Sequence, residues 1–196
     1  MTGERRIFLA RHGETEWNRV GRWQGRTDIP LSDVGRAQAL ALAERLRGRA
    51  IAQIHTSDLS RAHETARVVA ATLGIPAVGV DPRLRERGFG CFEGLTREEC
   101  ALHHPEAWQR YLADRRSTPP GAEPQTEVVT RVVEGLTAIA QATEVGQVTL
   151  VVSHGGAIRS FMSAVNGQPP PPLTNGALLV ARFVDQRFVA VDAEPD

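Results

Sequence analysis

The stretch FLARHGETEWN, residues 8–18, places a short apolar run directly before Arg11, His12 and Gly13. An apolar run that is bounded by glycine and polar residues is typical of a buried strand that ends at this point. An arginine and a histidine that follow a strand are, taken alone, most often polar loop residues. Their function therefore depends on whether other strand ends supply partners for Arg11 and His12.

The rest of the chain alternates between strand-like and helix-like patterns. Apolar runs predict strands over residues 6–10, 51–56, 77–80 and 148–153, and a C-terminal pair over 177–183 and 188–192. Helical spacing predicts helices over 32–46 after an N-cap at Ser32, over 58–73 starting at Asp58, over 95–116 with a break at Pro105, and over 126–143 and 155–165. This alternation predicts an α/β fold, a three-layer αβα sandwich with a mostly parallel mixed central sheet, and a single domain over residues 1–196.

The composition is that of an ordinary soluble protein, with 41% hydrophobic and 23% charged residues. The formal net charge is zero, which gives no indication of nucleic acid or an anionic membrane as a partner. No apolar run has the length of a membrane span, and the N-terminal residues do not resemble a secretory signal, so we expect a cytoplasmic protein. Cys91 and Cys100 lack metal-ligand spacing and are expected to be free thiols.

Three of the predicted strands end in residues that suit anion chemistry. The first ends at Arg11 and His12, the second is followed by Ser57 and Arg61, and the fourth ends at His154. Ligands of α/β sheets bind outside the carboxyl ends of the strands. Each residue alone could be a polar loop residue, or a solvated one in the case of Arg61. Two arginines and two histidines at one edge, next to helix N-termini, instead indicate a bound anion, most simply a phosphate.

A further segment, LRERGFGCFEG at residues 84–94, supplies two candidate carboxylates, Glu86 and Glu93. Among so many arginines, either one could simply form a surface salt bridge. Transfer of a phosphoryl group, however, requires a group that protonates the departing oxygen. Glu86 and Glu93 are therefore both candidates for a general acid.

Four segments carry a resemblance to a known family. LARHGETEWN, TSDLSRAHETA, LRERGFGCFEG and VVSHGGAIR occur in the order and spacing of the histidine phosphatase superfamily, the phosphoglycerate-mutase-like proteins. The similarity extends from residue 6 to about residue 165. The triplet of Arg, His and Gly is weak evidence alone, whereas four motifs in order are specific.

The resemblance implies a role for each matching residue. His12 would be the nucleophile that forms a phosphohistidine, since a neutral imidazole presents one lone pair while its other nitrogen donates to a backbone carbonyl. Arg11, Arg61 and His154 would surround the transferring phosphoryl group, and Glu86 would be the acid, with Glu93 more structural. Further positions that would line the phosphate and substrate are Asn18, Gln24, Gly25 and Gly155. The resemblance implies that no metal or other cofactor is required, because the arginines would supply the positive charge.

Phosphatases and mutases of this family differ at several positions. Mutases carry Tyr, Lys and Asn where this chain has Phe89, Arg97 and Gly156, together with a longer insertion after the glutamate motif. The PGAE segment at 120–123 also resembles a loop of the phosphatases. These features favour a phosphatase that hydrolyses a small-molecule phosphate ester. Arg115 and Arg116 resemble a mutase pair and keep a phosphoglycerate mutase open as the alternative, and a catalytically inactive phospho-ligand adaptor is a third hypothesis.

The arginines near the expected mouth of the site leave a question about the substrate. Arg22, Arg97, Arg115 and Arg116 could bind a second acidic group of the substrate, or they could pair with Glu98, Glu99, Glu106 or Asp114. Members of the family occur as monomers, dimers or tetramers, so a homodimer is one of the expected states.

Overall fold

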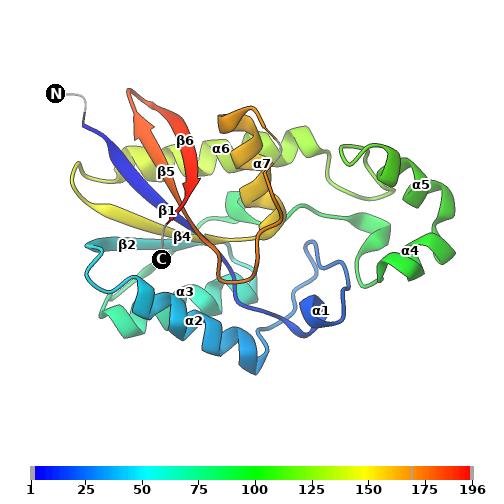
Figure 1. Cartoon of the computed structure of the whole chain (residues 1–196), viewed down its shortest axis with the longest axis horizontal. Coiled ribbons are helices and arrows are strands. Elements are labelled where there is room, and N and C mark those ends of the chain that lie inside the picture. Colours follow the sequence, from blue (N-terminus) through cyan, green and yellow to red (C-terminus); the bar gives the residue numbers. More distant parts are fainter. Residues whose placement is uncertain (1–2, 169, 195–196) are drawn as a thin grey trace.

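A six-stranded sheet lies at the centre of the computed structural model, which describes residues 3–168 and 170–194 (Figure 1). The strand order is β3-β2-β4-β1-β5-β6. The parallel strands are β1 (Arg5–Arg11), β2 (Ile51–Thr56), β3 (Val78–Val80) and β4 (Val148–Ser153). Two antiparallel strands, β5 (Leu178–Val184) and β6 (Arg187–Ala193), extend the sheet beyond β1. The prediction of a mixed, mostly parallel sheet is confirmed.

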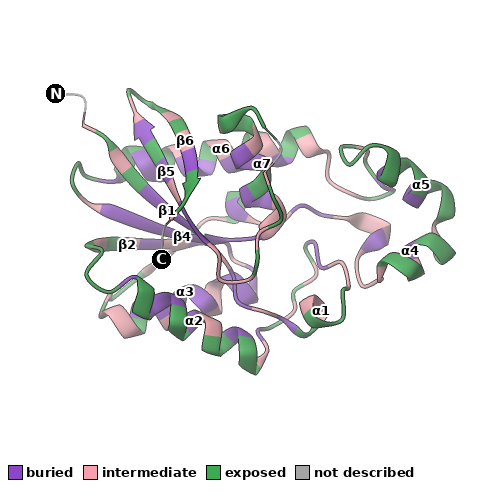
Figure 2. Cartoon of the chain, in the orientation of Figure 1, coloured by how far each residue is buried: buried purple, intermediate pink, exposed green. Residues whose placement is uncertain are grey.

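Helices cover both faces of the sheet and produce the three predicted layers. One face packs against α2 (Asp33–Arg45) and α3 (Ser60–Leu73), and the other against α6 (Gln125–Ala142) and α7 (Gly155–Asn166). Alternate residues of β1 serve the two cores, because successive side chains of a strand point to opposite faces. Ile7 and Leu9 lie in the core with α6 and α7, whereas Phe8 and Ala10 lie in the core with α2 and α3. Figure 2 shows β4 buried along its length, as expected for a central strand.

A smaller lobe, formed by α4 (Arg97–His103) and α5 (Pro105–Ala113), lies to one side of the sheet (Figure 1). The predicted break at Pro105 separates these two helices. The lobe has its own aromatic core, in which Trp108 and Tyr111 pack against Phe92 and Trp23. None of the described helices has the length and apolar character needed to cross a membrane.

The structure corrects one predicted helix start. Ser32 caps α2 as expected, and its hydroxyl accepts a hydrogen bond from the Gly35 backbone nitrogen. Asp58, by contrast, does not start α3, which begins at Ser60. The Asp58 carboxylate instead forms an ion pair with Arg85, a residue distant in sequence that competes for the expected capping group. The predictions also omitted α1 (Glu16–Arg19) and two short 3₁₀ turns, Pro82–Leu84 and Gly90–Phe92.

Candidate active site

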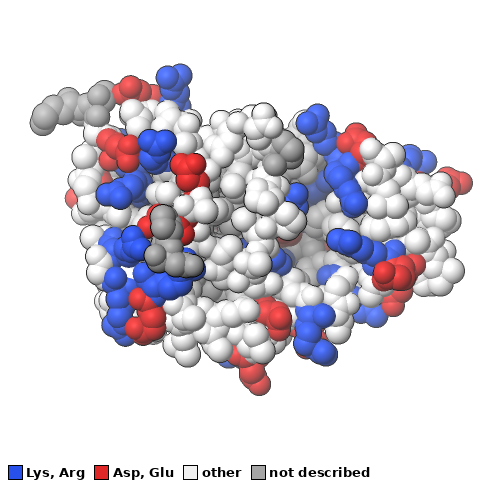
Figure 3. Space-filling view, in the orientation of Figure 1, with Lys and Arg blue, Asp and Glu red and all other residues white. Residues whose placement is uncertain are grey.

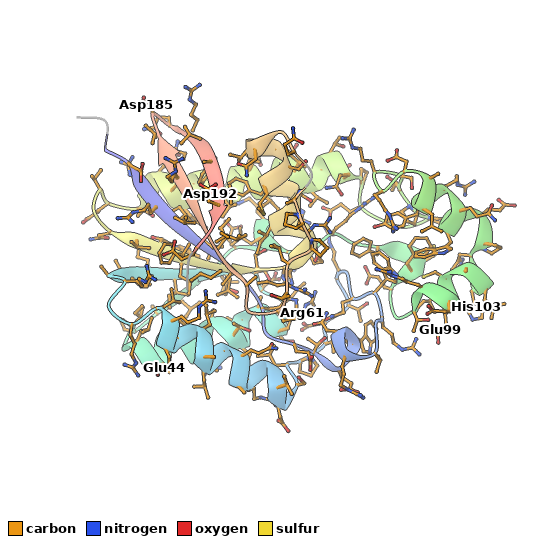
Figure 4. The ribbon with its side chains drawn as sticks, viewed as in Figure 1. Glu44, Arg61, Glu99, His103, Asp185 and Asp192 are labelled. Carbon is orange, nitrogen blue, oxygen red and sulfur yellow. The ribbon has the colours of Figure 1, made fainter. Side chains whose placement is uncertain are left out.

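The carboxyl ends of β1, β2 and β4 lie side by side, because the three parallel strands are neighbours in the sheet. Arg11 ends β1 and His12 follows it, while His154 follows β4. The ring centroids of His12 and His154 are 5.1 Å apart. Arg61, in the first turn of α3, lies between the sheet and the α1 segment (Figure 4). The structure thus brings together the two histidines and two arginines that the sequence placed at one edge.

His12 is held in one protonation form by the backbone. Its side chain is buried, and Nδ1 lies 2.6 Å from the carbonyl oxygen of Gly13. A carbonyl oxygen only accepts hydrogen bonds, so Nδ1 must carry the proton. The lone pair of the neutral ring is then on Nε2. This is the arrangement that the sequence analysis expected for a nucleophilic histidine.

Burial and nearby charge keep the His12 imidazole neutral. Burial is the main cause that lowers the pKa of His12 well below its ordinary value of 6.5, and the positive charges of Arg61 and Arg11 lower it further. The hydrogen bond to Gly13 acts in the opposite direction and is the weaker influence. A histidine with a lowered pKa keeps its lone pair at neutral pH. The neutral form of His12 is the form that a nucleophilic histidine requires.

Two guanidinium groups, one half-buried (Arg11) and one buried (Arg61), lie near His12. The Nη1 atom of Arg11 donates to the carbonyl oxygen of Leu173, and Arg61 donates to the carbonyl oxygens of Thr27 and Gly25. Arg61 is only 1% exposed, which excludes a solvated surface role. The Nε atoms of both arginines are buried and have no hydrogen-bond partner within the described part of the chain. These donors suit the oxygens of a phosphoryl group.

Glu86 lies at the N-terminus of α7. Its Oε2 atom accepts a hydrogen bond of 2.8 Å from the backbone nitrogen of Gly156, and Oε1 accepts one from the Arg87 nitrogen. Its charge also acts on Arg11 and Arg61, raising the pKa of both against the larger lowering effect of burial. Glu86 is therefore close enough to the arginines to act on the group that they would bind.

Glu93 is occupied by structural contacts. One carboxylate oxygen accepts hydrogen bonds from the backbone nitrogens of Arg26 and Phe89, and the other accepts them from the nitrogen and hydroxyl of Thr27. A Cβ atom at Gly25 would lie 2.0 Å from Glu93 Oε1, so this packing requires glycine at position 25. The contacts favour Glu86 over Glu93 as the acid.

The remaining candidate residues lie in the segment that follows β1 and at the start of α7. Asn18 accepts hydrogen bonds on Oδ1 from the backbone and hydroxyl of Thr15. Gln24 is buried, and its Oε1 atom has no partner among the described residues. Gly25 holds Arg61 through its carbonyl oxygen, and Gly155 is the first residue of α7. A Cβ atom at position 155 would lie 3.2 Å from Arg11 Nε, so Gly155 allows the guanidinium to approach.

The sequence profile of the histidine phosphatase superfamily (branch 1) matches residues 7–193. The chain belongs to the histidine phosphatase superfamily. The metal-independent phosphoserine phosphatase of Arabidopsis thaliana is 36% identical over 188 residues, which cover 93% of this chain and 78% of the relative. A probable phosphoglycerate mutase of Cronobacter sakazakii is 37% identical over 171 residues, 83% of this chain and 75% of the relative.

A solved structure agrees with this membership. The mycobacterial glucosyl-3-phosphoglycerate phosphatase in complex with VO3 superimposes with a TM-score of 0.81 at 30% identity, covering 92% of this chain and 97% of that one. Relatives named as phosphatases and as probable mutases are thus both similar to this histidine phosphatase family member. Among residues 3–168 and 170–194, no three His, Cys, Asp or Glu side chains are grouped so that they could hold a metal ion.

Several residues that the sequence analysis did not assign support the site. Asn175 donates from Nδ2 to the carbonyl oxygen of His12 and to Asn18 Oδ1. The hydroxyl of Thr65 accepts from the Gly13 nitrogen and donates to the Arg61 carbonyl oxygen. Thr65 could have been found from sequence, because it lies one helical turn after Arg61. Asn175 could not, because only the tertiary fold brings its loop to β1.

Arg131 holds the loop that carries Glu86. Its guanidinium donates to the carbonyl oxygens of Arg83, Arg85 and Glu86 and to both carboxylate oxygens of Glu123. All five N–H donors of an arginine are used in this way. The contact ties the PGAE segment, which resembles a phosphatase loop, to the backbone of the expected acid.

Some of the arginines near the expected mouth form ion pairs, whereas Arg115 contacts an aromatic ring. Arg22 forms an ion pair with Glu99, so the alternative of simple ion pairing is correct for this residue. Arg110 on α5 also lies 3.9 Å from a carboxylate oxygen of Glu106. Arg115 instead lies over the ring of Tyr111, 4.9 Å from its centroid. Figure 3 shows arginine side chains on both sides of the recess between the sheet domain and the α4–α5 lobe.

Because His12 and His154 are buried, we expect the free energy of unfolding to depend on pH. Burial is the main cause that lowers the pKa of both His12 and His154 well below 6.5, whereas in the unfolded chain both bind protons near that pH. The unfolded state then holds more protons, so the free energy of unfolding should fall as the pH drops below about 6.5. Each histidine contributes at most about 1.4 kcal/mol per pH unit.

Urea unfolding between neutral and mildly acidic pH measures this slope. A variant with His12→Gln and His154→Gln should lose stability less steeply over the same range, because it lacks both groups. An unchanged slope in the double variant would contradict the neutral state of the two histidines.

Proposed function

We propose that the protein is a metal-independent phosphomonoesterase that hydrolyses small-molecule phosphate esters through a phosphohistidine on His12. The observation that carries this proposal is the hydrogen bond from His12 Nδ1 to the Gly13 carbonyl oxygen, which leaves the Nε2 lone pair of a buried histidine free near two arginines. Nothing in a purely structural role requires a buried neutral histidine beside two arginines. The membership of the histidine phosphatase superfamily supports the same chemistry.

The reaction proceeds in two half-reactions. In the first, Nε2 of His12 attacks the phosphorus, the bond to the ester oxygen breaks, and protonated Glu86 gives its proton to the departing oxygen. In the second, the Glu86 carboxylate takes a proton from water, the resulting hydroxide displaces His12, and inorganic phosphate leaves. Arg11 and Arg61 stabilise the charge on the phosphoryl oxygens in both steps.

Position 156 favours a phosphatase over a mutase. The mutases of the family carry Asn where this chain has Gly156, and a Cβ atom here would lie 2.4 Å from Glu86 Oε1. Glu86 in its present position therefore leaves no room for a Cβ atom at residue 156. A mutase must also retain its substrate and exclude water, for which the chain lacks the longer insertion after the glutamate motif.

Phosphate release from p-nitrophenyl phosphate and phosphoserine, in buffer containing EDTA, tests the proposal. We expect release from both esters, and conversion of 3-phosphoglycerate to free phosphate rather than to its isomer. Isomerisation without phosphate release would identify a mutase. Activity that depends on added divalent metal would contradict the metal-independent chemistry.

The natural substrate is proposed to carry a second anionic group that Arg115 binds. The backbone carbonyl oxygen of Arg115 accepts a hydrogen bond of 3.4 Å from the guanidinium of Arg87, the residue after Glu86, so the Arg115 backbone lies within reach of the segment that carries the expected acid. Arg115→Ala should lower kcat/KM for phosphoserine about 10- to 100-fold, the value of one charge-assisted contact. It should leave p-nitrophenyl phosphate nearly unchanged, and Arg110→Ala on the same lobe is the matched control. Equal losses on both substrates would contradict a second anion site.

A further inference from the structure

Ser57 follows β2 directly and contacts His154, the second histidine of the site. Its side chain is fully buried, and Oγ lies 2.6 Å from Nε2 of His154, which is also fully buried. The backbone nitrogen of Ser57 is fixed by the carbonyl oxygen of Val152 on β4. The resemblance to the family assigned Ser57 no role, although it lies within one of the matching segments.

The His154 ring is neutral and therefore has one N–H and one lone pair. Burial is the main cause that lowers its pKa well below 6.5, and the positive charges of Arg61, Arg11 and Arg131 act in the same direction. Within the described residues, the Ser57 hydroxyl has no hydrogen-bond partner other than Nε2. Its hydrogen is satisfied only if Ser57 donates and Nε2 accepts. The proton of His154 is then on Nδ1.

Nδ1 of His154 is buried and has no hydrogen-bond partner among the described residues. The Nε atoms of Arg11 and Arg61 share this property. A phosphoryl oxygen only accepts hydrogen bonds, so it is attracted by an N–H at this position and repelled by a lone pair. The chemistry of the bound group therefore requires the same form of His154 that Ser57 favours.

We infer that Ser57 is a positioning residue whose hydroxyl fixes the His154 proton on Nδ1, where it is donated to the phosphoryl group transferred to His12. The role in catalysis rests on the proposed function, whereas the position of the proton does not. His12 and His154 have hydrogen-bond partners of opposite kind, an acceptor for His12 and a donor for His154. A carbonyl acceptor beside His12 leaves a lone pair for attack, and a hydroxyl donor beside His154 leaves an N–H for charge stabilisation.

Nuclear magnetic resonance of protein with ¹⁵N-labelled histidine measures the proton position without any substrate. In the wild-type protein, we expect His154 to carry its proton on Nδ1, with Nε2 unprotonated. Ser57→Ala should produce a mixture of both forms at His154 and leave His12 unchanged, because Gly13 still fixes that ring. Thr56→Val is the matched control, since Thr56 has a buried hydroxyl that contacts no described partner.

Kinetic measurements then test whether Ser57 positions the His154 proton or has only a structural role. Ser57→Ala should lower kcat for p-nitrophenyl phosphate about 10- to 100-fold, the value of a hydrogen bond to a charged group, with a smaller change in KM. Ser57→Thr, which keeps the hydroxyl, should restore both kcat and the His154 signals. In a His154→Gln background, Ser57→Ala should have no further effect.

The measurements can overturn the proposed function and the assignment of the His154 proton independently of each other. An inactive wild-type protein with the proton on Nδ1 of His154 would overturn the proposed function and leave the assignment of the proton intact. A proton on Nε2 of His154 in the wild-type protein would overturn the inference, whether or not any variant folds. An equal loss of kcat from Ser57→Ala with and without His154 would also overturn it.

Discussion

His12→Ala is expected to lower kcat for phosphate release from p-nitrophenyl phosphate by about 10⁴-fold or more, the usual cost of removing a nucleophile. Water would have to attack the phosphorus directly, because the variant lacks the Nε2 lone pair that the hydrogen bond to Gly13 leaves free in His12. A stopped or discontinuous assay of p-nitrophenol release measures the loss. The far-ultraviolet circular dichroism spectrum should be unchanged, because His12 contributes no strand contact through its ring.

His103→Ala is the matched control for this variant. His103 is exposed on α4 in the lobe, away from the strand ends (Figure 4). The variant His103→Ala should keep wild-type activity. Retained activity in His12→Ala would place the nucleophile elsewhere, and a wild-type protein that binds phosphate esters without hydrolysing them would support the adaptor hypothesis.

Glu86→Gln is expected to divide substrates by their leaving group. Alkyl phosphates such as phosphoserine need a proton on the departing oxygen, so kcat should fall about 10²- to 10⁴-fold, the usual contribution of a general acid. p-Nitrophenyl phosphate has a leaving group that is stable as an anion, so its first step should be affected much less. Parallel measurement of kcat/KM on both esters gives the contrast.

The variant Glu93→Gln tests whether the general acid is Glu86 and not Glu93. Glu93 accepts four hydrogen bonds from the segments around Thr27 and Phe89, so its loss should reduce stability and affect both esters alike. A leaving-group contrast in Glu93→Gln, with equal losses in Glu86→Gln, would move the acid to Glu93.

The sequence predicted the fold well where local patterns decide it. The apolar runs that became β1, β2 and β4 are bounded by Gly and polar residues, and their parallel arrangement follows from the helices between them. That arrangement alone brings Arg11, His12 and His154 to one edge. The chemistry of these residues then follows from their types, because an arginine at a helix N-terminus needs an anion nearby.

The contacts that the sequence did not predict depend on partners far away in the chain. Asp58 pairs with Arg85 instead of starting α3. Asn175 reaches His12 across more than 160 residues of sequence. Local spacing carries no signal for such pairs, since each depends on how the loops close over the sheet.

Rapid quench with an ester that carries radioactive phosphorus tests the central claim most directly. We expect label bound to the wild-type protein within the first turnover, stable in base and lost in acid, because a phosphorus–nitrogen bond hydrolyses in acid. Peptide mapping in base should place it on His12, and His12→Ala should show none. Label that survives acid, as on serine or threonine, would contradict the phosphohistidine mechanism.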